Sequence, residues 1–138
     1  VGMQVCAQKA QSKLGCTVKI FDPAYMSKDI VKELGFGPVG HAEEVETSHM
    51  MARYPDMVHL EKAIDNPIKD TPLYSVDPTY EHDTLCYVPS TLEHAKAAAK
   101  KSGGCTGEPS KSDARRGQIY HNHLVKNLIA VVEQLQNA

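Results

Sequence analysis

Apolar residues recur every three or four positions in several segments, which is the spacing of amphipathic helices. The predicted helices cover residues 3–14, 27–34, 43 or 44–54 and 91–101, and a last one runs from a cap at 110 or 112 to about 136. Gly15 and Pro55 end two of them, and Ser27 is the expected cap of another. The last helix should bury an apolar stripe on the core, formed by Leu124, Leu128, Val131, Val132 and Leu135.

Two short segments have the composition of strands. Cys16–Phe21 contains β-branched residues and stops at Asp22-Pro23, and residues 57–60 form a second apolar run. Helix, strand and helix in close succession predict an α/β fold with a parallel sheet in one domain, residues 1–138. Because ligands of such sheets bind beyond the carboxyl ends of the strands, we expect a site at the loop after Phe21 and at residues 35–41.

Residues 64–90 form a long segment interrupted by prolines. A loop of this length within a domain is usually functional or an interface arm. Its polar run at residues 80–83 contacts either substrate or, as is more common for such a run, only solvent.

The most informative polar segment follows the Gly/Pro loop at 35–40. His41 stands at the end of that loop, and Glu43, Glu44 and Glu46 come directly after it at a predicted helix start. A histidine beside a glutamate on the first turn of a helix can form an acid/base pair. The same carboxylates can instead only complement the helix dipole, with His41 as an ordinary loop residue. The spacing leaves both interpretations open.

The remaining histidines do not form a metal-binding pattern. His121 and His123 stand two positions apart in a predicted helix, so their side chains point about 200° apart and cannot easily bind one ion. We expect them on a solvated face or in packing contacts. His49 is expected on a helix surface or behind the site. No metal ligand is predicted within this chain.

Composition excludes several classes of protein. The chain has 138 residues with 15 basic and 17 acidic ones, and no basic stripe that would bind nucleic acid. No apolar run approaches the length of a membrane span, and no export signal is visible. The cysteines, which show no Cys-x-x-Cys spacing, are expected to be reduced and mostly buried in a cytoplasmic protein; they are Cys6, Cys16, Cys86 and Cys105.

Two ordered motifs resemble one family. Residues 41–48 (His-Ala-Glu-Glu-Val-Glu-Thr-Ser) resemble the His-Ala-Gly-x-x-Glu-Thr-Ser signature of the creatininase family of metal-dependent amidohydrolases, and residues 53–58 continue in register. Residues 104–110, followed by Arg116-Gly117, resemble the family's Gly-x-x-Gly-Asp-Pro turn before a terminal helix. The resemblance implies a three-layer α/β/α fold with a mostly parallel sheet, of which this chain would be the C-terminal half.

The resemblance also implies a mechanism and its partners. The family binds two divalent metal ions (Zn, Mn or Fe) through residues upstream of this signature, so the metals would be held mainly by residues outside this chain. An N-terminal half or a companion chain would supply them, and homo-oligomers are expected. His41 would be the catalytic acid/base, Glu46 would orient it or bind substrate, and Glu43 and Glu44 would line the substrate pocket.

Two departures from the family concern the substrate. The chain has no tryptophan, and Gly37–Gly40 lacks the acidic residue that many relatives carry there. Creatinine is therefore not the expected substrate. We expect a hydrolase that cleaves a C–N amide bond or opens a ring in a small polar, cyclic molecule, closer to family members such as keto-inositol hydrolases. The alternative from another class is a non-catalytic partner subunit of a split hydrolase.

Overall fold

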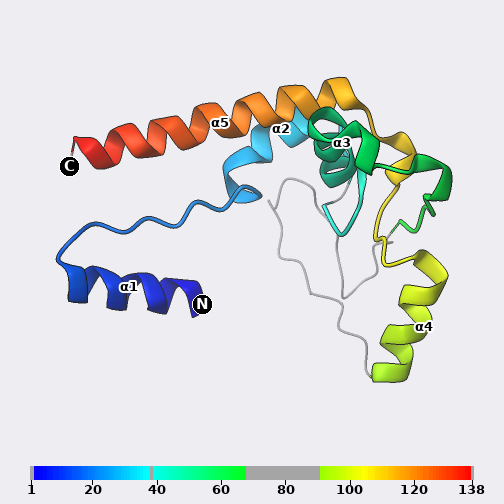
Figure 1. Cartoon of the computed structure of the whole chain (residues 1–138), viewed down its shortest axis with the longest axis horizontal. Coiled ribbons are helices and arrows are strands. Elements are labelled where there is room, and N and C mark those ends of the chain that lie inside the picture. The colour runs from blue at the N-terminus through cyan, green and yellow to red at the C-terminus, as the bar shows by residue number, and fades with distance from the viewer. Residues whose placement is uncertain (1, 38, 68–90, 138) are drawn as a thin grey trace.

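The computed structural model describes residues 2–37, 39–67 and 91–137. Its α-helices are joined by short 3₁₀ turns at Tyr25–Ser27, Pro55–Met57, Leu60–Lys62 and Pro109–Lys111 (Figure 1). The α-helices are α1 (Gly2–Leu14), α2 (Lys28–Glu33), α3 (Glu44–Arg53), α4 (Leu92–Ser102) and α5 (Ala114–Gln136). All the predicted helices are thus confirmed, with ends that shift by one or two residues.

The caps of two helices differ from the prediction. The hydroxyl of Ser27 does not cap α2 and instead donates to the carbonyl of Pro23 at 2.6 Å. Asp113, rather than a serine, caps α5, because its carboxylate accepts from the amides of Arg115 (2.6 Å) and Arg116 (3.3 Å). Asp113 immediately precedes the first helical turn, which is where a cap must stand.

Neither predicted strand is present among the described residues, so the sheet stays a prediction. Residues 16–21 pair with no strand in the described part of the chain. Of residues 57–60, Met57 ends one 3₁₀ turn and Leu60 begins the next. A strand needs a neighbouring backbone to accept its hydrogen bonds, and the amide of Val18 instead donates to the side chain of Gln11 at 3.0 Å. The described residues therefore contain no part of the parallel sheet expected from the sequence.

The core lies where α2, α3 and the first half of α5 meet. Its buried apolar side chains are Ile30, Val31, Phe36, Val45 and Tyr120. The two helices α3 and α5 cross closely at Gly117, where a Cβ atom would lie only 1.9 Å from the carbonyl oxygen of Ser48. Glycine at this position therefore sets how closely α3 and α5 approach.

The apolar stripe predicted along α5 is only partly buried: Leu124 packs against the core, and Val131 and Leu135 are half-buried. Leu128 and Val132 are 44% and 45% exposed, and the buried residues of α5 are Gly117 and Tyr120. Figure 1 shows the reason: α2 and α3 lie under the first half of α5, and the second half extends past them. Helix α1 buries none of its residues. Both α1 and the end of α5 thus present apolar side chains without a partner among the described residues.

Other expectations have mixed outcomes. Cys105 is buried as predicted, but Cys6 and Cys16 are exposed. Cys86, the run at 80–83 and most of the predicted 64–90 arm lie outside the described residues.

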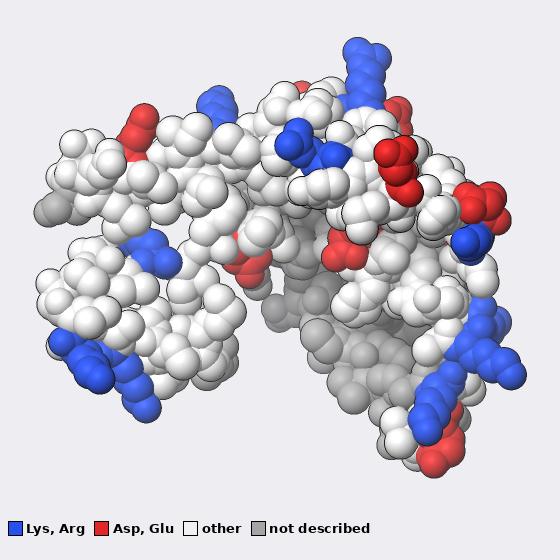
Figure 2. Space-filling view, viewed as in Figure 1, with Lys and Arg blue, Asp and Glu red and all other residues white. Residues whose placement is uncertain are grey.

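None of the helices in the described ranges combines the length and the apolar character needed to cross a bilayer. On the face drawn in Figure 2, basic side chains gather over α1 and α4 and also stand along the top of the molecule, with acidic ones interspersed.

Candidate active site

The backbone around His41 is held by a distant segment of the chain. The His41 amide donates to Thr106 Oγ1 at 2.7 Å, and the Thr106 amide donates to the His41 carbonyl at 2.9 Å. The next residue, Ala42, has a φ of 49°, in the left-handed region that non-glycine residues rarely adopt. His41 is exposed, and its imidazole makes no hydrogen bond or ion pair with any other described residue. The imidazole thus stands in solvent on a backbone that is fixed.

Glu46 supports the same bend from the helix side. Its Oε2 accepts from the Ala42 amide at 2.7 Å, while Glu43, the N-cap of α3, accepts from the amides of Val45 (2.6 Å) and Glu46 (3.0 Å). The arrangement is a variant of the capping box, in which the glutamate of the first turn reaches back to the chain before the helix. Glu46 therefore acts on His41 through the backbone of Ala42 and not through a contact with the imidazole.

Glu43 and Glu44 are buried behind this bend. Glu43 is 1% exposed, and burial raises its pKa to about 7 in spite of the two amides that favour the ionised form. Glu44 is 5% exposed and pairs with Arg116 Nη1 at 3.5 Å. The guanidinium of Arg116 also lies 4.5 Å from the ring centroid of Phe36. In this arrangement both carboxylates bind protein groups, and their role in substrate binding stays a prediction.

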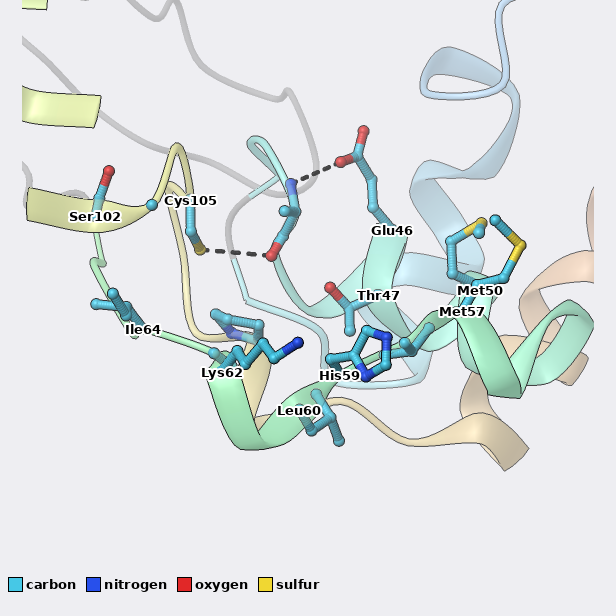
Figure 3. A pocket seen from close by; sticks show the side chains of 15 residues that line it. Glu46, Thr47, Met50, Met57, His59, Leu60, Lys62, Ile64, Ser102 and Cys105 are labelled. Atoms are coloured by element: carbon cyan, nitrogen blue, oxygen red, sulfur yellow. Dashed lines mark hydrogen bonds between the residues drawn. The ribbon is translucent and has the colours of Figure 1, made fainter. Parts of the chain in front are cut away.

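A cavity of about 360 Å³ opens beside Glu46 (Figure 3). Its walls come from one face of α3, from residues 57–64 and from the turn after α4. Apolar side chains, including Met50, Met57, Leu60 and Ile64, form most of the lining, and Glu46, His59 and Lys62 contribute charged or titratable groups. His41 does not line the cavity, although the adjoining Ala42 does. The largely apolar lining does not favour the small polar molecule expected from the sequence.

The sequence did not predict which residues bind the backbone of His41 and Ala42. For residues 104–110 the sequence predicts only a turn before the last helix, yet Cys105 Sγ donates to the Ala42 carbonyl at 3.4 Å and Thr106 binds His41. The signal was present as two motifs that occur together, but their contact depends on a chain reversal that local patterns do not encode.

The other histidines separate as their spacing predicts. His121 faces α3, where its Nδ1 lies 2.9 Å from Nε2 of His49, and His123 faces α2, where its Nε2 lies 3.1 Å from Asp29. Burial, His121 and the positive charge of Arg53 together lower the pKa of His49. No cluster of three or more His, Cys, Asp or Glu side chains able to hold a metal ion occurs within the described ranges.

The sequence and the fold of this chain are similar to those of known proteins. The model of the family described as creatininase, creatinine amidohydrolase, matches residues 3–132. A creatinine amidohydrolase from Pseudomonas putida is 38% identical over 65 residues, which are 47% of this chain and 24% of that protein. A crystal structure of creatinine amidohydrolase aligns with a TM-score of 0.62 at 22% identity and covers 96% of this chain.

The coverage of these relatives is partial. The chain spans about a quarter of the curated relative and 49% of the solved structure. The structural likeness shows a shared fold, and the family match extends over nearly the whole chain, including both motifs around His41 and Thr106. This chain therefore belongs to the creatininase family.

Proposed function

We propose that this chain is the C-terminal part of an amidohydrolase in which His41 is the catalytic acid/base. The observation that carries the proposal is the match of residues 3–132 to the creatininase family, combined with the placement of the signature histidine on a fixed backbone. The substrate class is a small, cyclic molecule with a C–N amide bond.

The chemistry of His41 follows from its position. An exposed imidazole can both take and give a proton. As water adds to the amide carbon, protonated His41 would give its proton to the leaving nitrogen while the C–N bond breaks. The proton released by the attacking water restores the imidazolium, which leaves a carboxylic acid and an amine as products. Glu46 is a positioning residue in this scheme, because it holds Ala42 in the bend.

The described residues of this chain do not form a ligand set for the divalent metals that the family resemblance implies. The donor groups of the described residues do not come together in threes, and Glu43 and Glu44 already bind amides and an arginine. We therefore propose that Zn, Mn or Fe is bound mainly by residues outside this chain.

A second segment of protein is part of the proposal. The chain corresponds to about half of the solved relative, and α5 carries an exposed apolar stripe. The stripe consists of Val125, Leu128, Ile129 and Val132, which share one helix face. Apolar faces of this kind mark interaction surfaces. We propose that the segment supplying the other half of the fold covers it, with homo-oligomers forming from the completed unit.

The test is His41→Ala in the complete assembly, meaning this chain with the segment that supplies the rest of the fold. The assembly is assayed for hydrolysis of two cyclic amides, creatinine and hydantoin, and of formamide as an acyclic comparison. Turnover should fall roughly 10²–10⁴-fold, the usual contribution of a positioned proton-transfer group, while the fold and the metal content stay unchanged. Glu46→Gln should cause a smaller loss.

The matched control is His123→Ala, which removes a histidine that faces α2. It should leave turnover near the wild-type level. If His41→Ala retains full turnover, His41 is not the acid/base. If the wild-type assembly hydrolyses none of the amides, the non-catalytic partner subunit becomes the better interpretation.

A further inference from the structure

The segment Cys105-Thr106-Gly107 lies against the His41 bend, although more than sixty residues separate them. We propose that Thr106 is the positioning residue for His41: it holds the histidine backbone on both sides so that the imidazole projects in one direction. The inference rests on the proposed function of His41 and identifies a residue on which that function depends.

The contact between Thr106 and His41 is reciprocal. Thr106 offers its hydroxyl oxygen to the His41 amide at 2.7 Å, and its own amide donates to the His41 carbonyl at 2.9 Å. Both backbone groups of His41 are therefore bound to a single residue. Two short bonds of this kind fix the position of the Cα atom and its peptide planes, so the direction in which the side chain leaves the backbone is set before any substrate binds.

Close approach by two glycines makes the contact possible. A Cβ on Gly40 would lie 2.3 Å from both the carbonyl oxygen and Oγ1 of Thr106, and a Cβ on Gly107 would lie 2.4 Å from the Cβ of Glu43. Gly107 also has a φ of 154°, which side chains rarely adopt. The two segments are thus built to lie in backbone contact, and any side chain at either glycine would separate them.

The segment Cys105-Thr106-Gly107 and the turn after it are themselves bound to residues 65 and 66. Gly107 exchanges two backbone hydrogen bonds with Asn66, at 2.7 and 3.0 Å, and the side chain of Asn66 donates to the carbonyl of Cys105 at 3.0 Å. Asp65 accepts from the amide of Ser110 at 3.0 Å and from its hydroxyl at 2.5 Å. The residues on either side of Thr106 are therefore bound to a second segment, which helps to keep Thr106 in place against the bend.

The bend needs this support because it is strained. A residue with a side chain is strained in the left-handed region, and Ala42 adopts φ 49° there, directly after His41. Glu46, Cys105 and Thr106 each bind a backbone group of residues 41 or 42. Thr106 is the one whose side chain binds His41 itself, so its hydroxyl should control the histidine more than its neighbours do.

The experiment compares Thr106→Val, which keeps the shape and removes the hydroxyl acceptor, with Thr106→Ser, which keeps the acceptor. The first measurement does not depend on activity: hydrogen exchange of the His41 amide, followed by NMR. Loss of one hydrogen bond of about 1 kcal/mol should speed exchange about fivefold in the valine variant, and the serine variant should exchange like wild type. Thr17→Val, at an exposed position before the core, is the control.

The second measurement is turnover in the complete assembly with whichever of creatinine, formamide or hydantoin the wild type hydrolyses. Thr106→Val should lower kcat by roughly 10²-fold, the effect of a misplaced catalytic group, with a much smaller change in KM. Thr106→Ser should restore most of kcat. A merely structural role would lower the amount of folded enzyme without this separation of kcat from KM.

Unchanged exchange at the His41 amide in Thr106→Val would overturn the proposal, as would a serine variant as defective as the valine one. Wild-type kcat in Thr106→Val, with His41→Ala inactive, would also overturn it. If the wild-type assembly hydrolyses none of the amides, the proposed function fails on its own, and the exchange measurement still decides whether Thr106 holds His41.

Discussion

Gly117→Ala should destabilise the protein, against the usual effect of this substitution in a helix. Alanine in place of glycine inside a helix ordinarily gains about 1 kcal/mol. At Gly117 the new Cβ would meet Ser48 O at 1.9 Å, Ser48 C at 2.3 Å and His49 N at 2.9 Å. All three atoms belong to the backbone of α3, so no side-chain rotation can relieve the overlap.

The magnitude follows from how far the helices must separate. The shortest approach is about 1.5 Å closer than ordinary van der Waals contact. Overpacking of this kind costs roughly 3 kcal/mol, and the shift also strains the 2.9 Å bond from the Asp113 amide to Ser48 Oγ. After the gain in helix propensity, the expected net loss is about 2 kcal/mol.

Urea unfolding followed by circular dichroism measures this loss. For a domain of this size the midpoint should fall by about 1 M. Gly2→Ala is the matched control, because nothing lies within 4 Å of its Cβ, and it should shift the free energy of unfolding by no more than about 0.5 kcal/mol. A midpoint for Gly117→Ala equal to or above that of the wild type would refute the close helix crossing on which the core depends.

Two further predictions concern pH. The pKa of His49 is lowered in the folded protein, first by burial and then by His121 and Arg53, so folding favours the neutral imidazole. Its contribution to stability should be complete above the ordinary pKa of 6.5 and should be lost as pH falls below it. His121→Asn should weaken this dependence on pH. If the urea midpoint changes with pH between 5 and 8 equally strongly in the variant and the wild type, the prediction is contradicted. The pKa of Glu43 is shifted in the opposite direction, because burial raises it from 4.5 to about 7. Its contribution is therefore complete below pH 4.5 and is lost as pH rises towards 7. Glu43→Gln should remove that loss, and a carboxyl carbon signal of Glu43 that titrates near 4.5 in an NMR titration would exclude the shift.

The helices were predictable because their signals are local. The apolar spacing and Pro55 defined α3, and the 3.6-residue period of the last segment defined the extent of α5. The motif at residues 41–48 also pointed to the right family from sequence alone. Each of these features depends on neighbours within a turn or two of helix, which the order of residues specifies directly.

Other features depend on what a segment packs against. Residues 16–21 have strand-like composition, yet no described backbone lies beside them to complete a ladder. Likewise, α5 carries more apolar positions than one core contact can cover, and only the placement of α2 and α3 selects Gly117 and Tyr120 for burial and leaves Leu128 exposed.

The candidate site shows the same division. The sequence identified His41 and the carboxylates that follow it, because a histidine before a helix start is a local pattern. The tertiary structure decided which of those groups remain accessible: it buried Glu43 as a helix cap, paired Glu44 with Arg116, and left His41 exposed. It also brought Thr106 to the histidine from 65 positions away. Hydrogen bonds over such a separation form only when the intervening chain folds back, and no local preference encodes that return.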